Sequence, residues 1–338
     1  MTGKKIVLMN HTDMQGHHFG CARVMRLIED GLTSRGCVIT ARLDGKMDWR
    51  KDAQALSVLA DCDAIVTNGE GTLHHGKRKA GWLMAAGTHD VTRDKEMALI
   101  NALYQDNPQS WAPMLRGFRH LYARDSRSAE EMARQAGRAV PWFGDLSTSD
   151  GKIDGAVDRA GIVVGDSVST TTTDALGVLA MALSAQESVH LVPLTTSWYE
   201  ENPYRSWPSR WLRRRAAQKK FLRRQERFPL YRHLPSEAAY LDLLRESRLL
   251  VTGRFHGVCL SLVTGTPFVT VSSNSWKIEA LFADVGLDPR RLVKTEDLTT
   301  RSVLETDWSF SDTEVQNINA FLDRNKACAT AMYDAIAG

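Results

Sequence analysis

The sequence is poor in cysteine and has no close cysteine pair. Its five cysteines, an odd number, lie at positions 21, 37, 62, 259 and 328, and no two of them form a C-x-x-C motif. Disulfide frameworks and zinc sites both depend on such spacing. We therefore expect reduced cysteines and no metal site.

The sequence also lacks a long hydrophobic run. A membrane-spanning helix needs about 20 consecutive apolar residues, and no stretch of this chain comes near that length. The first apolar run, Ile6–Met9, is shorter than the roughly 7–15 residues of a secretory signal peptide. We expect a protein of the cytoplasm.

Positive charge is concentrated in one segment. The whole chain carries a net charge of +3, but residues 205–232 hold eleven Lys and Arg and one acid, Glu226. This basic insert also contains Trp and Phe. It fits either a solvated basic helix or a patch for anionic lipid or a lipid-linked glycan at the inner face of a membrane. No nucleic-acid-binding motif accompanies it, so we expect no nucleic acid partner.

Short β-branched runs alternate with helical patterns in the first half of the chain, which is typical of a parallel α/β sheet. The predicted strands are Lys5–Met9, Val38–Leu43, Ala64–Thr67, 119–123 and 140–143. The predicted helices are Cys21–Ser34, Gln54–Ala60, 93–105 and 126–137.

The same alternation restarts after a stretch rich in Ser, Thr, Asp and Gly at 147–161, which we interpret as a linker. Here the predicted strands are Ile162–Gly165, Val189–Pro193, Leu249–Thr252 and Pro267–Ser272. The predicted helices are Thr173–Ala185, Ser236–Arg245, Phe255–Val263 and Trp276–Val285, with Thr172 and Ser236 as N-caps.

These patterns predict an α/β protein of two Rossmann-like domains facing each other across a cleft. The first domain is residues 1–150, the second is 160–310 with the basic insert at 205–232, and 311–338 forms a closing helix. Ligands of such sheets bind beyond the carboxyl ends of the strands. Three motifs follow predicted strands.

The first motif is the glycine-rich segment Asn68-Gly69-Glu70-Gly71-Thr72-Leu73-His74-His75. Gly69 and Gly71 would let backbone N–H groups approach an anionic ligand. The spacing matches neither a P-loop nor G-x-G-x-x-G. A tight structural turn is the alternative, but Glu70 and His74 favour a functional role. Adjacent histidines point in different directions, which argues against zinc.

The second motif is Leu121-Tyr122-Ala123-Arg124-Asp125-Ser126-Arg127-Ser128, in which a strand ends in Arg124. An arginine fork at a strand end suits a carboxylate or phosphate. A surface salt bridge is the alternative.

The third motif is Gly253-Arg254-Phe255-His256-Gly257, with Lys277 after the next strand. These side chains would form an anion site with a built-in proton carrier. The alternative is a helix N-terminus with incidental basic residues.

The ordered set resembles the polysaccharide pyruvyl transferase family. That family has an Asn-containing loop after its first strand, a later glycine-rich turn, an R-[DE]-x-x-S motif, and R-x-H followed by a lysine. The matching segments here are Asn10–Gly20, Asn68–Gly71, Arg124–Ser128, Arg254–His256 and Lys277. The chain departs from the family at Asn10-His11-Thr12-Asp13, where N-x-G-D is usual. It also departs at the glycine turn, which holds Glu70 and ends in two histidines.

The resemblance implies a GT-B-like fold and transfer of the enolpyruvyl unit of phosphoenolpyruvate onto hydroxyls of a polysaccharide sugar, or of its lipid-linked precursor, as a ketal. It implies His256 as general acid and Arg124, Arg254 and Lys277 as cationic clamps, with no cofactor or metal. Glu70 is the candidate base for an acceptor hydroxyl, with Asp13 and His74 as alternatives. Asn10, Gly69 and Gly71 complete the predicted substrate-binding residues.

Two other functions fit the same pattern. One is a GT-B glycosyltransferase that uses a nucleotide-sugar donor. The other is a non-catalytic protein that binds a glycan or an anion.

Overall fold

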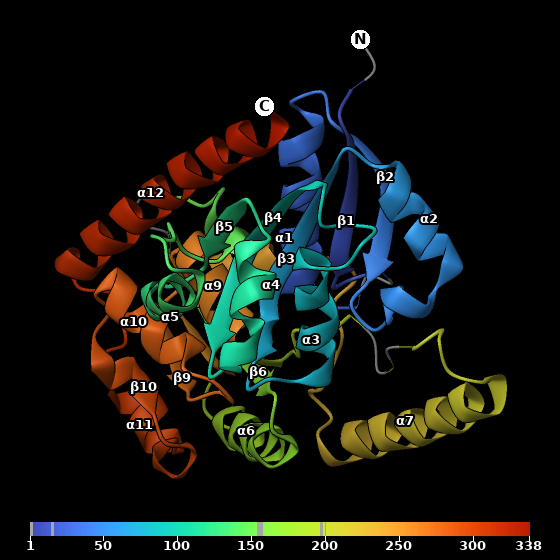
Figure 1. The fold of residues 1–338 in the computed structure, drawn as a ribbon. Coiled ribbons are helices and arrows are strands. Elements are labelled where there is room, and N and C mark those ends of the chain that lie inside the picture. Colours follow the sequence, from blue (N-terminus) through green and yellow to red (C-terminus); the bar gives the residue numbers. More distant parts are fainter. Residues whose placement is uncertain (1–2, 15–16, 154–157, 197–198, 200) are drawn as a thin grey trace. The chain divides into compact units, whose positions relative to one another are not determined.

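The computed structural model describes residues 3–14, 17–153, 158–196, 199 and 201–338, and the chain forms two α/β units (Figure 1). Unit 1 consists of residues 1–14, 24–149 and 324–338, and unit 2 of residues 15–23 and 150–323. The predicted pair of Rossmann-like domains is confirmed. Two segments are divided differently from the prediction: residues 15–23 belong to unit 2, and the closing helix is shared between the units.

Unit 1 contains a five-stranded sheet in which every neighbouring pair is parallel. Its order is β2 (Val38–Asp44), β1 (Lys5–His11), β3 (Ala64–His74), β4 (Glu96–Gln105) and β5 (His120–Ala123). The order reverses between β1 and β3. In open α/β sheets, the carboxyl ends of strands at such a switch point are where ligands bind.

Helices cover both faces of this sheet. On β1, Ile6 and Leu8 pack in one core with α1 and the end of α12, whereas Val7 and Met9 pack in the other with α2, α3 and α5. This alternation follows from the two-residue period of a strand. The helices are α1 (Phe19–Thr33), α2 (Ala53–Asp61), α3 (Arg78–Met84), α4 (Ala112–Arg116), α5 (Ser126–Ala136) and the end of α12 (Asp312–Ala337).

Unit 2 has a parallel sheet in the order β10 (Leu292–Val293), β9 (Phe268–Val271), β8 (Leu249–Gly253), β6 (Ile162–Ser167) and β7 (Val189–Leu191). Numbered along the chain, this is the same order as in unit 1, with the switch point between β6 and β8. Its helices are α6 (Thr170–Leu183), α7 (Trp207–Arg227), α8 (Glu237–Glu246), α9 (Phe255–Thr264), α10 (Lys277–Val285), α11 (Thr300–Glu305) and the start of α12.

Residues 93–105 were predicted as a helix, and this prediction is wrong, because residues 96–105 form β4. Eight consecutive residues of β4, from Met97 to Tyr104, are buried. A strand at the centre of a parallel sheet is covered on both faces and is therefore apolar without alternation. Such a run cannot be distinguished from a buried helix by periodicity.

Three further local predictions are corrected. Residues 140–143 form no strand; Trp142 makes one isolated bridge to Ala123, and Pro141 has no N–H to donate to a ladder. The glycine-rich segment is not a turn, because β3 continues to His74 with an irregularity after Glu70. The N-cap of α6 is Ser169 rather than Thr172.

None of the helices in the described residues is long and apolar enough to cross a membrane. The five cysteines, all described, form no disulfide bond.

Candidate active site

In unit 1, polar side chains link β1 and β3 at the switch point of the sheet. The Asn10 side-chain amide donates to the Asn68 carbonyl oxygen at 2.5 Å and to Thr72 Oγ1 at 3.1 Å. The Glu70 carboxylate accepts from Thr12 Oγ1 at 2.5 Å and from Asn68 Nδ2 at 3.1 Å. The structure therefore fixes two of the predicted site residues, Asn10 and Glu70, in one buried network.

Three neighbouring strands hold a non-glycine residue in the left-handed region at this edge. The φ angles are 58° at Asn10 on β1, 33° at Glu70 on β3 and 54° at Asn101 on β4. Asparagine adopts this conformation more readily than most residues, whereas for Glu70 it costs roughly 1 kcal/mol or more. Such outliers concentrate at functional sites, so this edge of the sheet is a candidate site on backbone geometry alone.

The two predicted glycines differ in what surrounds them. A Cβ on Gly69 would lie 2.6 Å from the Cα of Ala102, so glycine is required there for β3 to pass close to β4. A Cβ on Gly71 would have one neighbour within 4 Å, the Arg124 guanidinium at 3.9 Å. Gly71 thus leaves open space beside Arg124.

Arg124 follows β5 and is held by a carboxylate that the sequence analysis did not identify. Its side chain is 2% exposed, and its Nη1 donates to Asp145 Oδ2 at 3.1 Å. The other oxygen of Asp145 accepts from the Ser147 backbone amide. Asp145 therefore has a fixed orientation and in turn orients the arginine.

The remaining predicted residues of unit 1 lie apart from this network. His74 is at the far end of β3, where its Nε2 lies 2.9 Å from the Lys77 ammonium and its Nδ1 lies 2.7 Å from that of His75. Asp13 is half-buried in the turn that follows β1. These positions favour neither His74 nor Asp13 over Glu70 as the acceptor base.

In unit 2, the switch point of the sheet holds an arginine–aspartate pair. Arg254 directly follows β8 and is the N-cap residue of α9, and Asp166 lies near the end of the neighbouring β6. Asp166 Oδ2 accepts from Arg254 Nε at 2.8 Å and from Nη2 at 2.5 Å. Its Oδ1 accepts from the Leu194 backbone amide at 3.0 Å, so the carboxylate itself is anchored.

His256 lies in the first turn of α9 and packs against the first turn of α1. The two imidazoles of His18 and His256 meet edge to face with centroids 5.3 Å apart. A Cβ on Gly20 would lie 2.2 Å from His256 Cγ, so only glycine allows this approach. The first turn of α1 is fixed to unit 2 because the Phe19 amide donates to the Leu194 carbonyl.

The three predicted basic residues of unit 2 lower the pKa of one half-buried neighbour, His18. The pKa of His18 is well below its usual value, first because the ring is buried and then because of the charges of His256, Arg254 and Lys277. Lys277 begins α10, and its Nζ donates to Asn274 Oδ1 at 3.1 Å. The structure therefore brings Arg254, His256 and Lys277 to the surroundings of His18.

His18, Cys21 and His256 also have potential metal-ligand atoms within 4.8 Å of one another. This set could not be predicted from the sequence, because His256 joins His18 and Cys21 only through folding. The nearby charges of Arg254 and Lys277 oppose a metal cation at this position. No metal enters the function proposed below.

The family model described as polysaccharide pyruvyl transferase matches residues 103–275, about half of the chain. The chain belongs to this family. The matched part of the chain contains Arg124, Asp166, Arg254 and His256, whereas Glu70 and Lys277 lie outside it. No curated protein matches the sequence.

Solved structures resemble the transferase in fold. The UDP-GlcNAc 2-epimerase from Methanocaldococcus jannaschii is 10% identical with a TM-score of 0.54, over 96% of this chain and 98% of that one. A putative UDP-N-acetylglucosamine 2-epimerase from Listeria monocytogenes is 12% identical with a TM-score of 0.54, over 97% of this chain and 94% of that one. The glycotransferase of kitacinnamycin is 11% identical with a TM-score of 0.50, over 99% of this chain and 97% of that one. At these identities the likeness concerns the fold alone.

Four residues of the transferase that orient the predicted ones were missed from the sequence: His18, Gly20, Asp145 and Asp166. Asp166 had a signal, because it lies near the end of an apolar strand, in Gly165-Asp166-Ser167, and Arg254 directly follows the neighbouring strand β8. The other three had none, since their importance depends on contacts made only in the fold.

Proposed function

We propose that this pyruvyl transferase moves the enolpyruvyl unit of phosphoenolpyruvate onto two hydroxyls of a sugar, in a polysaccharide or its lipid-linked precursor, and releases phosphate. The observation that carries the proposal is the Arg254–His256 turn at the switch point of unit 2. It offers a cation fixed by Asp166 and an imidazole two residues away, within the matched part of the family. Anionic ligands bind at such strand ends.

The proposed chemistry begins with a proton. His256 donates it to the methylene carbon, which leaves an oxocarbenium-like carbon bearing the carboxylate and the phosphate. One sugar hydroxyl adds to that carbon, and phosphate then leaves with its electron pair as the second hydroxyl adds. One hydroxyl proton goes to phosphate, the base releases the other to solvent, and solvent returns a proton to His256. Acid catalysis of this kind contributes about 10²–10⁴-fold.

Arg254 and Lys277 are the proposed clamps for the carboxylate and phosphate, and Arg124 is the third. Guanidinium groups suit this role because they bind planar anions in a bidentate manner and keep their charge. A clamp fixed in advance needs no reorganisation during the reaction. Asp166 and Asp145 are the residues that fix the two arginines here.

Glu70 is the proposed base for an acceptor hydroxyl. Its carboxylate is buried and already accepts two hydrogen bonds, so its orientation is set. Asn10, which shares the network, is proposed to contact the acceptor. We propose a cytoplasmic protein that works beside the inner face of a membrane when its acceptor is lipid-linked.

The decisive experiment measures phosphate release from phosphoenolpyruvate in the presence of an acceptor mixture, with mass spectrometry of the product. We expect a sugar mass increase matching a pyruvyl ketal, and a loss of about 100-fold or more in His256→Asn. His190→Asn is the matched control, because His190 is a half-buried histidine of the same unit that contacts Arg232 instead. If His256→Asn kept more than about a tenth of the activity, His256 would not be the acid.

A thermal-shift panel separates this donor from nucleotide sugars. A ligand at about 100 times its Kd adds about 2.7 kcal/mol to the free energy of unfolding. Stabilisation by UDP- or CMP-sugars but not by phosphoenolpyruvate would favour a glycosyltransferase. Stabilisation by phosphoenolpyruvate without phosphate release would favour a non-catalytic binding protein.

A further inference from the structure

The helix α7 of the basic insert is attached to unit 2 along one narrow side. Its half-buried residues include Phe221 and Arg224, and none of its 21 residues is buried. The Phe221 ring packs edge to face on Tyr231 with centroids 5.9 Å apart, and Arg224 Nη2 donates to Asp174 of α6 at 2.7 Å. The rest of the helix surface faces away from the core of its own unit.

Large apolar side chains lie exposed on that free surface. Among the described residues, nine large hydrophobic side chains are exposed, and five of these lie between 204 and 222. Trp207 is 67% exposed and Leu212 is 61% exposed. At 3.6 residues per turn, the four on the helix fall within an arc of roughly 140°. They are Trp207, Trp211, Leu212 and Leu222.

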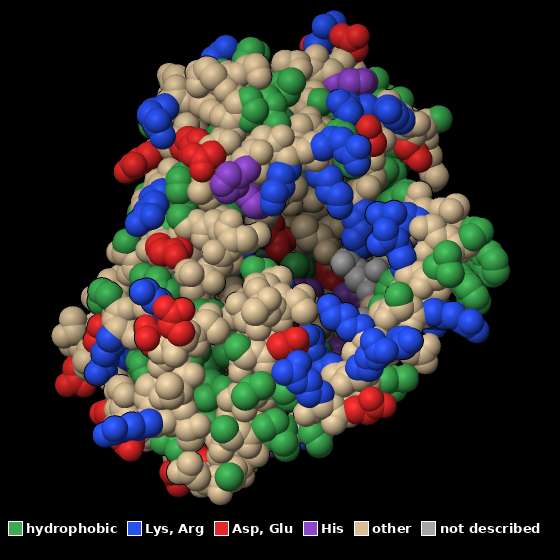
Figure 2. Space-filling view, turned by 90° about the horizontal axis from the view of Figure 1, so that it is seen from below, with side chains coloured by type: hydrophobic (Ala, Val, Ile, Leu, Met, Phe, Trp, Pro, Cys, Tyr) green, Lys and Arg blue, Asp and Glu red, His purple; other side chains and the backbone are tan. Residues whose placement is uncertain are grey.

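Cations lie within and beside this arc, because Arg215 and Lys219 fall between Leu222 and Leu212 at about 3.6 residues per turn. The Arg215 guanidinium lies over the Trp211 ring at 4.2 Å from its centroid, which places a charge directly beside an exposed aromatic. Figure 2 shows Lys and Arg side chains gathered at the right of the face drawn there, where α7 lies. From Arg205 to Arg232 the net charge is +10.

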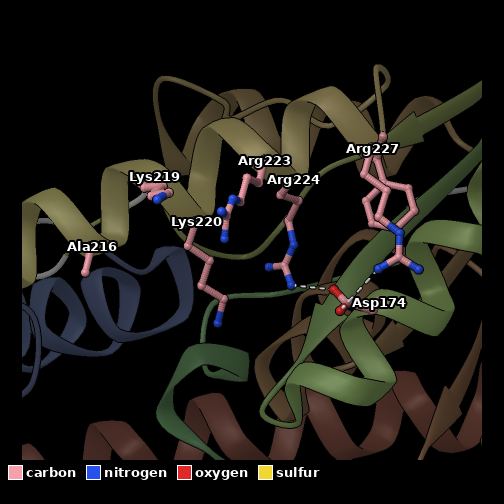
Figure 3. A pocket seen from close by; sticks show the side chains of 8 residues that line it. Asp174, Ala216, Lys219, Lys220, Arg223, Arg224 and Arg227 are labelled. Carbon is pink, nitrogen blue, oxygen red and sulfur yellow. Dashed lines mark hydrogen bonds and ion pairs between the residues drawn. The ribbon is translucent and has the colours of Figure 1, made fainter.

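The cations also line a pocket of about 400 Å³ between α7 and α6. Figure 3 shows Lys220, Arg223 and Arg224 extending from α7, with Arg224 reaching Asp174. Asp174 is the single acid in the lining and pairs with Arg224 and Arg227. In the described part of the chain, Lys219, Lys220 and Arg223 have no carboxylate within ion-pair distance. The lining of this pocket therefore suits binding of an anionic ligand.

We propose that α7 docks on a bilayer containing anionic phospholipid. Trp207, Trp211, Leu212 and Leu222 enter the headgroup region, and the lysines and arginines beside them bind lipid phosphates. Basic helices with an aromatic and aliphatic stripe lie in the interface in this way. A nucleic acid backbone would use the cations but not the exposed leucines, so a membrane fits the whole surface better.

This inference goes beyond the proposed reaction and is tested without substrate. The full chain is co-sedimented with phosphatidylcholine vesicles with and without phosphatidylglycerol. We expect binding to the anionic vesicles alone, weakened by added salt because exposed charges are screened. Equal binding to both vesicle types, or to neither, would overturn the proposal.

Two variants of α7 distinguish the contribution of its charge to vesicle binding from that of its apolar side chains. Reversing three cations in K219E/K220E/R223E should weaken vesicle binding by about two orders of magnitude. The control is R290E/K294E/R301E, which makes the same charge change at exposed cations elsewhere in unit 2 and should keep binding. If the control lost as much, binding would reflect net charge rather than α7.

The second variant, W207A/L212A, should lose the binding that persists at high salt, and its tryptophan fluorescence should respond less to vesicles than that of the wild type. Unchanged binding would overturn insertion of the stripe. Circular dichroism verifies that each variant is folded. Tight binding of single-stranded RNA, lost in K219E/K220E/R223E and not displaced by anionic vesicles, would assign the surface to nucleic acid instead.

Discussion

Asp166 accepts two hydrogen bonds on one oxygen from the Arg254 guanidinium and one on the other from the backbone of Leu194. The arginine is therefore oriented before any ligand arrives. Because β6 and β8 are parallel neighbours, their carboxyl ends lie at the same edge of the sheet and bring the two side chains together.

Replacing Asp166 by Asn should misplace Arg254 without removing it. We expect kcat/KM for phosphoenolpyruvate to fall by about 100-fold, mostly through KM, because a displaced clamp weakens donor binding. The measurement is steady-state phosphate release. Glu187→Gln is the matched control, since Glu187 pairs with Arg248 in the same unit. A loss shared by both variants would point to general destabilisation rather than to positioning.

The two-unit fold could be predicted from the sequence because the hydrophobic residues of most strands and helices recur with a clear period. It failed where burial removes the period, as in β4, whose apolar run was interpreted as a helix. It also failed where a glycine serves packing, as at Gly69, which lets β3 continue beside Ala102 rather than turn.

The candidate site was predictable only in part. Arg124, Arg254, His256 and Lys277 each follow a strand, and strand ends are where such folds bind ligands. The contacts of His256 with the first turn of α1 join segments far apart in sequence. No local sequence pattern predicts such contacts, so the roles of His18 and Gly20 could be inferred only from the structure.

Replacing Gly20 by Ala should reduce activity while leaving the helix intact. A Cβ there would lie 2.2 Å from His256 Cγ, so the imidazole must move. Alanine itself favours a helix. Because the added Cβ would also lie 2.4 Å from His256 Cβ, the start of α9 must shift as well. We expect kcat to fall by about 100-fold and the free energy of unfolding to fall by roughly 1–3 kcal/mol, as measured by phosphate release and calorimetry.

The control for Gly20 is Gly81→Ala in α3. A Cβ at Gly81 would meet the Trp111 ring at an ordinary 3.5 Å, so activity should be retained. Full activity in Gly20→Ala would show that the position of His256 is not critical.

His18 should make the protein less stable below neutral pH. Its pKa in the folded chain lies well below the ordinary 6.5, first through burial and then through His256, Arg254 and Lys277. The unfolded chain therefore binds one more proton below pH 6.5, and the free energy of unfolding falls there by up to about 1.4 kcal/mol per pH unit. Above that pH the effect vanishes.

The variant His18→Asn isolates this contribution. Denaturant unfolding at about pH 7.5 and about pH 5.5 should show a smaller pH dependence in the variant than in the wild type, by roughly 1 kcal/mol. Other histidines with a lowered pKa, such as His11 and His233, act equally on both proteins. An unchanged difference between the two pH values would contradict a neutral His18.

Breaking one buried ion pair should strongly destabilise unit 2. Arg291 is fully buried; its Nε and Nη2 donate to the two oxygens of Glu314 at 2.8 and 2.9 Å, and its Nη1 to the Trp308 carbonyl at 2.6 Å. Arg291→Met leaves the carboxylate buried without its cation. We expect a loss of roughly 3–5 kcal/mol in the free energy of unfolding.

The neighbouring Arg290→Met is the matched control for Arg291→Met, because Arg290 is 48% exposed and should cost at most about 1 kcal/mol. Burial alone would raise the pKa of Glu314, but hydrogen bonds from Arg291 and from the backbone amides of Ser311 and Asp288 lower it to about 2. Stability from the pair is therefore present above about pH 4.5 and is lost as the pH falls toward about 2. Arg291→Met should flatten this acid dependence in denaturant unfolding. Equal losses in the two arginine variants would show that leaving Glu314 buried without its cation has no specific cost.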